Sequence, residues 1–323
     1  MKWVWRALGI LVAALVIAFL VLRVPDTDAG QMRAKYGAAP SQFVEIGGGT
    51  LVHLRDEGPR DAPVIVLLHG SSADLHTWQP WVDGLADDYR VIRFDQVGHG
   101  LTGPDPAHDY SLANYVADIG EVADALGLER FVLGGSSMGG AHAVAFAAAH
   151  GERLDGLILV DAGGAPIETE AEGNIGFAIM RTPGLNRIAE HITPRSLVEQ
   201  SFRQSVSNED VVTEEAIDRY WELLRYPGNR AATVRRSARD WTYLDAKDVG
   251  AIDVPTLVMW GDEDSLISVD AAYWYEEHLP ASTLAIYRGI GHLPHEEAPA
   301  ASLADLRAWL AQTLEPEAGQ DPA

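Results

Sequence analysis

Short apolar runs alternate with longer stretches of helical periodicity along most of the chain. Runs of strand length stand at 64–68, 90–94, 131–133, 157–160, 256–260 and 284–287. Helix-length stretches stand at 75–86, 111–126, 137–150, 269–279 and 300–314. Strands that are apolar on both faces and alternate with helices are typical of a parallel sheet covered by helices. An α/β fold is therefore predicted.

Two further features complete the predicted core. The segments 43–46 and 51–55 flank three consecutive glycines at 47–49, and glycine tolerates the positive φ of a tight turn, so a hairpin is expected in front of the parallel strands. Between Ala162 and Val254 the alternation stops, and helical pieces are separated by proline-containing pairs. We expect a core at 41–163 and 254–314, a helical insertion at 164–253, and a disordered tail at 315–323.

The first residues have the pattern of a membrane anchor or a signal sequence. A basic, aromatic start (MKWVWR) precedes sixteen uncharged residues at 7–22, and Arg23 closes the run. Sixteen is short for a spanning helix, but Trp3, Trp5 and a snorkelling Arg23 extend it to membrane thickness. Thr27-Asp28-Ala29 is a poor cleavage site, so an uncleaved anchor at 1–24 is preferred over a signal peptide that is removed.

Charge around this run predicts the side on which the rest of the chain lies. Lys2, Arg6 and the amino terminus outweigh Arg23, which is followed by two aspartates, so the N-terminus is expected inside the cell. The folded domain would then face the periplasm or the exterior, and cleavage would instead give a secreted protein. Residues 25–40 show no periodicity and are expected to form a tether.

Overall composition excludes several classes of protein. The formal net charge of -23 repels nucleic acid, so no nucleic-acid partner is expected. The chain of 323 residues has no cysteine, which excludes disulfides, zinc ribbons and a thiol nucleophile. No metal motif and no dinucleotide fingerprint is present, so we expect neither a metal nor an organic cofactor.

A serine on a glycine-rich turn is the strongest chemical signal. Residues 135–139 read Gly-Ser-Ser-Met-Gly, which fits G-x-S-x-G, and they lie between a predicted strand and an alanine-rich helix. A serine on so sharp a turn is held in a strained conformation with its hydroxyl exposed at the helix N-terminus. The alternatives are a turn with a capping serine or a phosphate loop, but no Lys-Ser/Thr follows.

With this motif in its context, the chain resembles the α/β-hydrolase superfamily from about Phe43 to Leu314. Four other segments agree with the resemblance, and their order is the one that the fold requires. They are His69-Gly70, Asp95-Gln96-Val97-Gly98-His99-Gly100, Trp260-Gly261-Asp262-Glu263-Asp264 and Gly291-His292.

The resemblance implies a role for each site residue. Ser137 would be the nucleophile, His292 the base that takes its proton, and Asp264 the acid that fixes the imidazole tautomer. Backbone N–H groups of Ser71 and Met138 would form the oxyanion hole. Asp95 has a structural turn as its expected role.

Other residues compete for two of these roles. His295 is the nearest rival of His292 as the base. Asp262, Glu263 and Asp161 are rivals of Asp264 as the acid, and Asp161 follows a strand at a place that some relatives use instead.

In the resemblance, the insertion at 164–253 is a helical cap over the catalytic face, and its aromatic and apolar residues are expected to line a substrate pocket. The candidates are Phe177, Met180, Tyr220, Trp221 and Trp241. At helical spacing, packing inside the cap is the alternative role for most of them.

The expected activity is hydrolysis of an ester or lactone with an apolar acyl group. Ser136 to Gly140 also resembles the C–C bond hydrolases of aromatic-ring degradation. Two departures separate the chain from them, Ser71-Ser72-Ala73 in place of a glycine-rich run and Leu293-Pro294 where they tend to carry Trp. A cofactor-free haloperoxidase or perhydrolase would use the same triad, and a silent ligand receptor would share only the fold.

Overall fold

A computed structural model describes residues 2–167, 174–239 and 243–314, and it has one central sheet of eight strands. The strands stand in the order β1-β2-β4-β3-β5-β6-β7-β8, with β1 and β2 antiparallel to their neighbours and the rest parallel. Their bounds are β1 Ser41–Ile46, β2 Thr50–Glu57, β3 Val64–Leu68, β4 Arg90–Phe94, β5 Phe131–Ser136, β6 Leu154–Val160, β7 Thr256–Gly261 and β8 Ser282–Tyr287. The predicted hairpin is β1 and β2, joined by the short 3-10 turn Gly47–Gly49.

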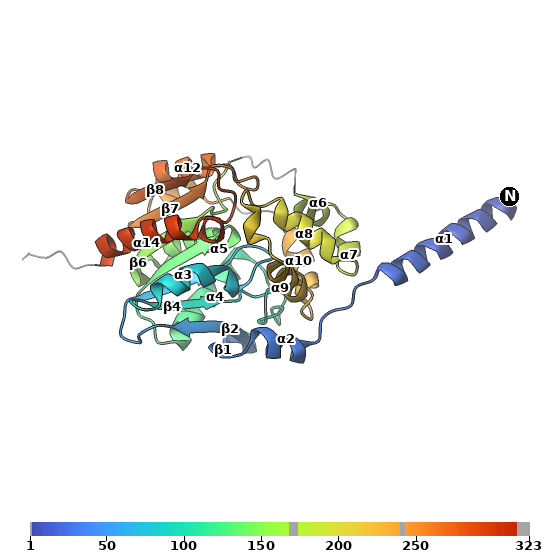
Figure 1. The fold of residues 1–323 in the computed structure, drawn as a ribbon, viewed down its shortest axis with the longest axis horizontal. Helices are drawn as coiled ribbons and strands as arrows, with labels where there is room; N and C mark the ends of the chain where they lie inside the picture. Colours follow the sequence, from blue (N-terminus) through green and yellow to red (C-terminus); the bar gives the residue numbers. More distant parts are fainter. Residues whose placement is uncertain (1, 168–173, 240–242, 315–323) are drawn as a thin grey trace, which may run out of the picture.

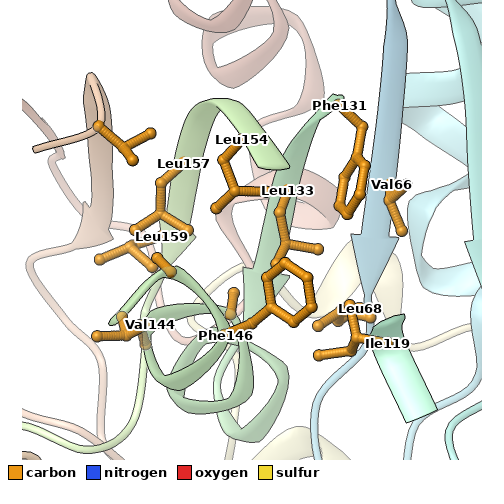
Figure 2. Packing of buried hydrophobic residues seen from close by; sticks show 14 of the residues in the cluster. Val66, Leu68, Ile119, Phe131, Leu133, Val144, Phe146, Leu154, Leu157 and Leu159 are labelled. Carbon is orange, nitrogen blue, oxygen red and sulfur yellow. The ribbon is translucent and has the colours of Figure 1, made fainter. Parts of the chain in front are cut away.

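Helices cover both faces of the sheet, as the alternation predicts. Their bounds are the 3-10 turn η2 Leu75–Trp78, α3 Gln79–Leu85, α4 Leu112–Ala125, α5 Met138–His150, α11 Ala246–Val249, α12 Asp270–His278, α13 Pro294–Glu297 and α14 Pro299–Leu314. On one face, side chains of β3, β5 and β6 meet those of α4 and α5 (Figure 2). On the other face, Trp81 of α3 and Trp309 of α14 pack on the opposite side chains of the same strands.

Within the described ranges 161–167, 174–239 and 243–245, five short α-helices lie between β6 and α11, where the sequence predicts the insertion. They are α6 Ile175–Arg181, α7 Leu185–Ala189, α8 Arg195–Arg203, α9 Glu214–Leu224 and α10 Asn229–Ser237. Figure 1 shows them gathered at one end of the sheet as a separate layer. Their own small core includes Phe202 of α8 and Ile217 of α9, packed against Leu293 that follows the predicted base. We call α6 to α10 the cap.

The N-terminal run forms the helix α1 Lys2–Leu22, none of whose residues is buried. Among the described residues it is a helix long and apolar enough to cross a membrane, with a mean hydropathy of 2.5 over its most apolar window. At about 1.5 Å of rise per residue, this length matches the hydrocarbon thickness of a bilayer. A membrane anchor and a signal sequence both have these properties.

The structure differs from the expected tether at 25–40. Residues Ala29–Tyr36 form a helix, α2, which Asp28 caps through its side chain, and Met32 of α2 is buried against Leu101, Leu223 and Tyr226. The sequence pattern misses this helix because it has eight residues and one deeply buried side chain, which is too few for a visible period. The disordered tail expected at 315–323 lies outside the described residues.

Candidate active site

Ser137 lies on a sharp turn between β5 and α5. Its backbone has φ 53° and ψ −118°, a conformation that L-residues adopt at a cost of roughly 1–3 kcal/mol. Two hydrogen bonds hold it there, because its N–H donates to the Val160 carbonyl at 3.0 Å and its own carbonyl accepts from the Gly163 N–H at 2.8 Å. The turn is therefore fixed by strand β6 and the loop after it.

Both glycines of the motif are required by close backbone contacts. A Cβ at Gly135 would lie 2.2 Å from the Gly139 carbonyl oxygen, and one at Gly139 would lie 2.5 Å from the Leu68 carbonyl oxygen. No side chain fits at such distances. The pattern G-x-S-x-G thus follows from the packing of the turn against itself and against the end of β3.

The loop after β3 passes directly beside the serine. A Cβ at Gly70 would lie 3.1 Å from the Cβ of Ser137. The backbone of Ser71, the next residue, therefore starts beside the serine side chain. Met138, the other predicted oxyanion residue, is the first residue of α5, where a backbone N–H has no acceptor inside its own helix. From the cap, Nη2 of Arg236 donates to Oγ of Ser71 at 3.1 Å, a contact that no sequence motif signals.

Asp264 and His292 meet at the ends of β7 and β8. Nδ1 of His292 lies 2.7 Å from Oδ2 of Asp264, and because a carboxylate only accepts, the proton is on Nδ1. Oδ1 of Asp264 accepts from the N–H groups of Leu266 and Ile267 at 2.7 and 3.1 Å. The carboxylate is thus fully oriented, and it leaves Nε2 of the imidazole as the acceptor.

Glycine also brings these two loops together. A Cβ at Gly261, the last residue of β7, would lie 2.1 Å from the carbonyl oxygen of Gly291. The segments Gly261 to Asp264 and Gly291 to His292 are therefore recognisable in the sequence for the same reason as the serine turn, since their backbones touch.

Glu297 holds the His292 loop and is a residue that the sequence analysis does not identify. Its carboxylate accepts from the N–H groups on both sides of the base, Gly291 at 3.1 Å and Leu293 at 3.0 Å. It also accepts from Ser207 and Asn208 of the cap at 2.8 and 2.9 Å. A buried carboxylate thus ties the His292 loop to the cap, and no sequence pattern points to it.

Ser137 and His292 line one cavity between the core and the cap, with about 1230 Å³ of empty space when its open mouth is included. Ser71 lies on the same wall. The cap contributes mainly apolar side chains, among them Ile179, Met180, Leu197, Val198, Phe202 and Leu224. A substrate that reaches Ser137 is therefore surrounded largely by hydrocarbon.

The predicted pocket residues divide into three groups. Met180 and Tyr220 line the cavity. Trp221 does not, because its ring faces Arg225, with the guanidinium 3.5 Å from the ring centroid, and its Nε1 donates to the Thr193 carbonyl at 2.8 Å. Its place on α9 next to Tyr220 turns it to a different side of the helix, so this prediction is corrected. Trp241 and the side chain of Phe177 lie outside the described part of the chain.

The rival base is accounted for elsewhere. The His295 ring is completely buried, stacks on Trp78 at 4.3 Å between centroids, and has Nε2 2.9 Å from Oγ1 of Thr77. Burial lowers the pKa of His295 to about 3. It is a neutral core residue on the buried side of α13 and is not among the residues that line the cavity.

The rival acids occupy different environments. Asp262 and Glu263 are exposed, and Asp262 closes a turn by accepting from the Gly289 N–H at 2.7 Å. Asp161 is completely buried, and one of its oxygens accepts from the Gly261 N–H at 3.0 Å. Burial, and then the neighbouring carboxylate of Asp264, raise the pKa of Asp161 well above its usual range. Asp161 is therefore a buried neighbour of Asp264 whose charged form is disfavoured.

The donor atoms of Asp161, Asp264 and His292 lie within 4.8 Å of one another, which is close enough to share a metal ion. Both oxygens of Asp264 already accept hydrogen bonds, and Nδ1 of His292 carries a proton. An ion would have to displace all of these contacts. The arrangement suits a hydrogen-bonded acid and base better than a ligand set.

A polar network supports the floor of the site. Nε2 of His69 accepts from the Gln96 N–H at 3.0 Å, and the Gln96 side chain lies 2.7 Å from both the His69 carbonyl and Nδ1 of His142. Burial lowers the pKa of His69, and lowers that of His142 to about 3, so both rings are neutral. Asp95 accepts from the N–H groups of Leu75 and Leu101, which agrees with a structural turn.

Comparison with known proteins places this geometry in a family. Residues 63–299 match the family model of the alpha/beta hydrolase fold. The chain belongs to the α/β-hydrolase superfamily. The family match covers the serine turn, the cap and both loops that carry Asp264 and His292.

Individual relatives carry the names of different hydrolases. A 2-hydroxy-6-oxononadienedioate/2-hydroxy-6-oxononatrienedioate hydrolase of Pseudomonas putida is 28% identical over 273 residues, which cover 79% of this chain and 91% of that one. A thermophilic esterase from Thermogutta terrifontis is 26% identical, with a TM-score of 0.69, covering 85% and 99%. A membrane phospholipase A is 21% identical, with a TM-score of 0.74, and covers 98% and 100%, which extends the likeness of fold to the N-terminal region. The first two similarities support a hydrolase, and the third shows the fold.

Proposed function

We propose that the protein is a serine hydrolase that cleaves a carboxylic ester with an apolar acyl group. One observation carries the proposal: Ser137, on a strained turn, and His292, oriented by Asp264, line the same cavity, whose cap side is mainly apolar. The esterase among the relatives supports the same class of bond.

The mechanism uses each residue in turn. Nε2 of His292 removes the proton of Ser137 as Oγ attacks the ester carbonyl, and the Asp264 carboxylate stabilises the imidazolium. The N–H groups of Ser71 and Met138 donate to the oxyanion, and such a donor contributes about 3 kcal/mol to the transition state. The imidazolium then protonates the leaving alcohol, and water releases the acyl group from Ser137 by the same steps.

Cleavage of a C–C bond is the second candidate, since the relative from Pseudomonas putida is a dienedioate hydrolase. The guanidinium of Arg236 beside Ser71 would suit a substrate carboxylate. The serine-rich loop Ser71-Ser72-Ala73 and Leu293 after the base favour the ester.

Purified protein tests the proposal with four measurements. A fluorophosphonate probe should label the wild type and not Ser137→Ala, and p-nitrophenyl esters of increasing chain length should be hydrolysed by the wild type alone. Because Oγ is the only atom removed, Ser137→Ala should unfold at the same temperature. Equal turnover by Ser137→Ala would exclude Ser137 as the nucleophile. Bleaching of a chromogenic 2-hydroxy-6-oxodienoate, with no ester hydrolysis, would favour the second candidate.

We also propose that α1 is an uncleaved anchor with the N-terminus inside, so that the domain lies in the periplasm or outside the cell. Lys2 and Arg6 before the apolar run support this orientation, and secretion after cleavage is the alternative. Protease added outside the inner membrane should digest the domain of the full-length protein. A mature chain that begins near Gly30, or protection from the protease, would refute the anchor or its orientation.

A further inference from the structure

The C-terminal end of α1 is attached directly to the cap. The N–H of Val24 donates to the His191 carbonyl at 2.9 Å, and the ring of Phe19 meets that of His191 edge-on at 6.0 Å between centroids. His191 lies two residues after α7. If α1 spans a bilayer, the two residues from Leu22 to Val24 let the cap move at most about 7 Å from its surface.

The next residues fix this attachment from two sides. Arg230 of α10 donates to the Val24 carbonyl and to Asp26 at 2.9 and 2.6 Å, and Arg225 donates to the Pro25 carbonyl at 3.2 Å. Both arginines are buried, with exposed fractions of 7% and 8%. Buried guanidinium groups need these partners, so the segment that joins α1 to the domain is held in place.

The side of the cap next to this attachment has apolar side chains in contact with solvent. Leu185 and Ile188 of α7 are each 49% exposed, and three residues apart on a helix they share one face. Arg187 of α7 and Arg23 after α1 are also exposed, so two arginine side chains lie close to this attachment along the chain. In Figure 1, α1 projects from the end of the molecule where α6, α7 and α8 lie.

The same stretch of the cap lines the cavity of Ser137. Ala189 at the end of α7, Glu190 and Thr193 contribute to its wall, beside Ile179 and Met180 of α6. The cavity thus extends from the serine to the part of the cap that adjoins α1.

We propose that the α7 side of the cap, with Leu185 and Ile188, rests on the bilayer that α1 spans, and that the substrate is a fatty-acyl ester drawn from that bilayer into the cavity. The occupant of this surface is lipid, because the attachment at Val24 and His191 keeps α7 at the membrane surface. A short helix with exposed apolar side chains and nearby arginines suits the interface between head groups and acyl chains. This inference rests on the proposed ester hydrolase and on the anchor.

Two substrates separate this inference from the proposed function. Full-length protein in phosphatidylcholine vesicles would be assayed with soluble p-nitrophenyl butyrate and with a long-chain fluorogenic glycerol ester embedded in the bilayer. The double variant Leu185→Asp/Ile188→Asp should lose about tenfold in kcat/KM for the embedded ester and keep its rate on the soluble ester. Tyr273→Asp on α12, also 49% exposed, is the matched control and should change neither rate.

Each outcome bears on one proposal. If the wild type hydrolyses neither ester, the proposed function fails. If it hydrolyses the soluble ester but not the embedded one, or if the double variant cleaves the embedded ester as fast as Tyr273→Asp does, the inference fails while the esterase remains. If the double variant loses activity on both esters while its unfolding temperature is unchanged, Leu185 and Ile188 affect catalysis itself and not contact with lipid, and the inference fails.

Contact with lipid can be measured without any substrate. Because the chain has no cysteine, Ile188→Cys provides a single site for an environment-sensitive fluorophore. When the labelled full-length protein is placed in vesicles, brominated lipid should quench the fluorescence of the label at position 188. The same label at Tyr273→Cys should not be quenched. Equal quenching at both positions, or at neither, would overturn the docking of α7 on the bilayer.

Discussion

Replacing Asp264 by asparagine should damage catalysis through the proton on His292. In the wild type, Oδ1 of Asp264 accepts from two backbone N–H groups while Oδ2 accepts from Nδ1 of His292 at 2.7 Å. An asparagine must keep its oxygen on the two N–H groups, so its NH₂ group faces Nδ1. The imidazole then accepts there and carries its proton on Nε2, where it cannot take the proton of Ser137.

The expected fall in kcat follows from the loss of this tautomer. We expect kcat to fall roughly 10²–10⁴-fold, or about 3–5 kcal/mol of transition-state stabilisation. KM should change little, since Asp264 is not among the described residues that line the cavity. Steady-state hydrolysis of a p-nitrophenyl ester measures both constants, and the rate of fluorophosphonate labelling should fall with kcat.

Asp161→Asn is the matched control. Asp161 is buried beside Asp264, but Nδ1 of His292 pairs with Asp264, so an amide of the same shape at 161 should leave the imidazole tautomer unchanged and lower kcat less than about tenfold. Asp262→Asn and Glu263→Gln, on exposed side chains, should do less still. If Asp161→Asn proves the damaging change and Asp264→Asn the mild one, the acid is Asp161 and the reasoning above is wrong.

Two further predictions concern stability. Burial, followed by three nearby acidic side chains, raises the pKa of Asp118 on α4 to about 7, so the stability that this residue gives in its protonated form is lost as the pH rises from about 4 to about 7. Asp118→Asn should raise the free energy of unfolding by on the order of 1 kcal/mol above pH 7 and by progressively less toward pH 4, whereas a gain independent of pH would exclude Asp118 as its source. Deleting residues 1–22 removes one edge-on ring contact, Phe19 with His191, and should give a soluble protein whose unfolding temperature changes little. Deleting 1–28 also removes the partners of Arg225 and Arg230 and should cost about 2 kcal/mol or more. Thermal unfolding of the two truncated proteins measures the difference, and equal stability would mean that residues 23–28 are the loose tether that their composition suggests.

Local features of the sequence determined the fold and the positions of the reacting groups. Apolar runs and their spacing predicted the parallel sheet because buried strands and covering helices have different periods. The segments with Ser137, Asp264 and His292 could be found because backbone contacts at Gly135, Gly139, Gly261 and Gly291 allow no side chain. Such contacts are properties of short segments, so a short pattern records them.

Only the tertiary structure decided which groups surround these residues. Glu297 on the His292 loop and Arg236 on Ser71 join segments that lie far apart in the chain, and hydrogen bonds of this kind leave no periodic trace. Trp221 and Tyr220 are neighbours in sequence, yet only Tyr220 faces the cavity, because the orientation of α9 on the core selects the side. The docking of residues 24–26 rests on buried arginines of the cap, about two hundred residues away along the chain. Their burial, and hence their need for partners, exists only once the cap has folded.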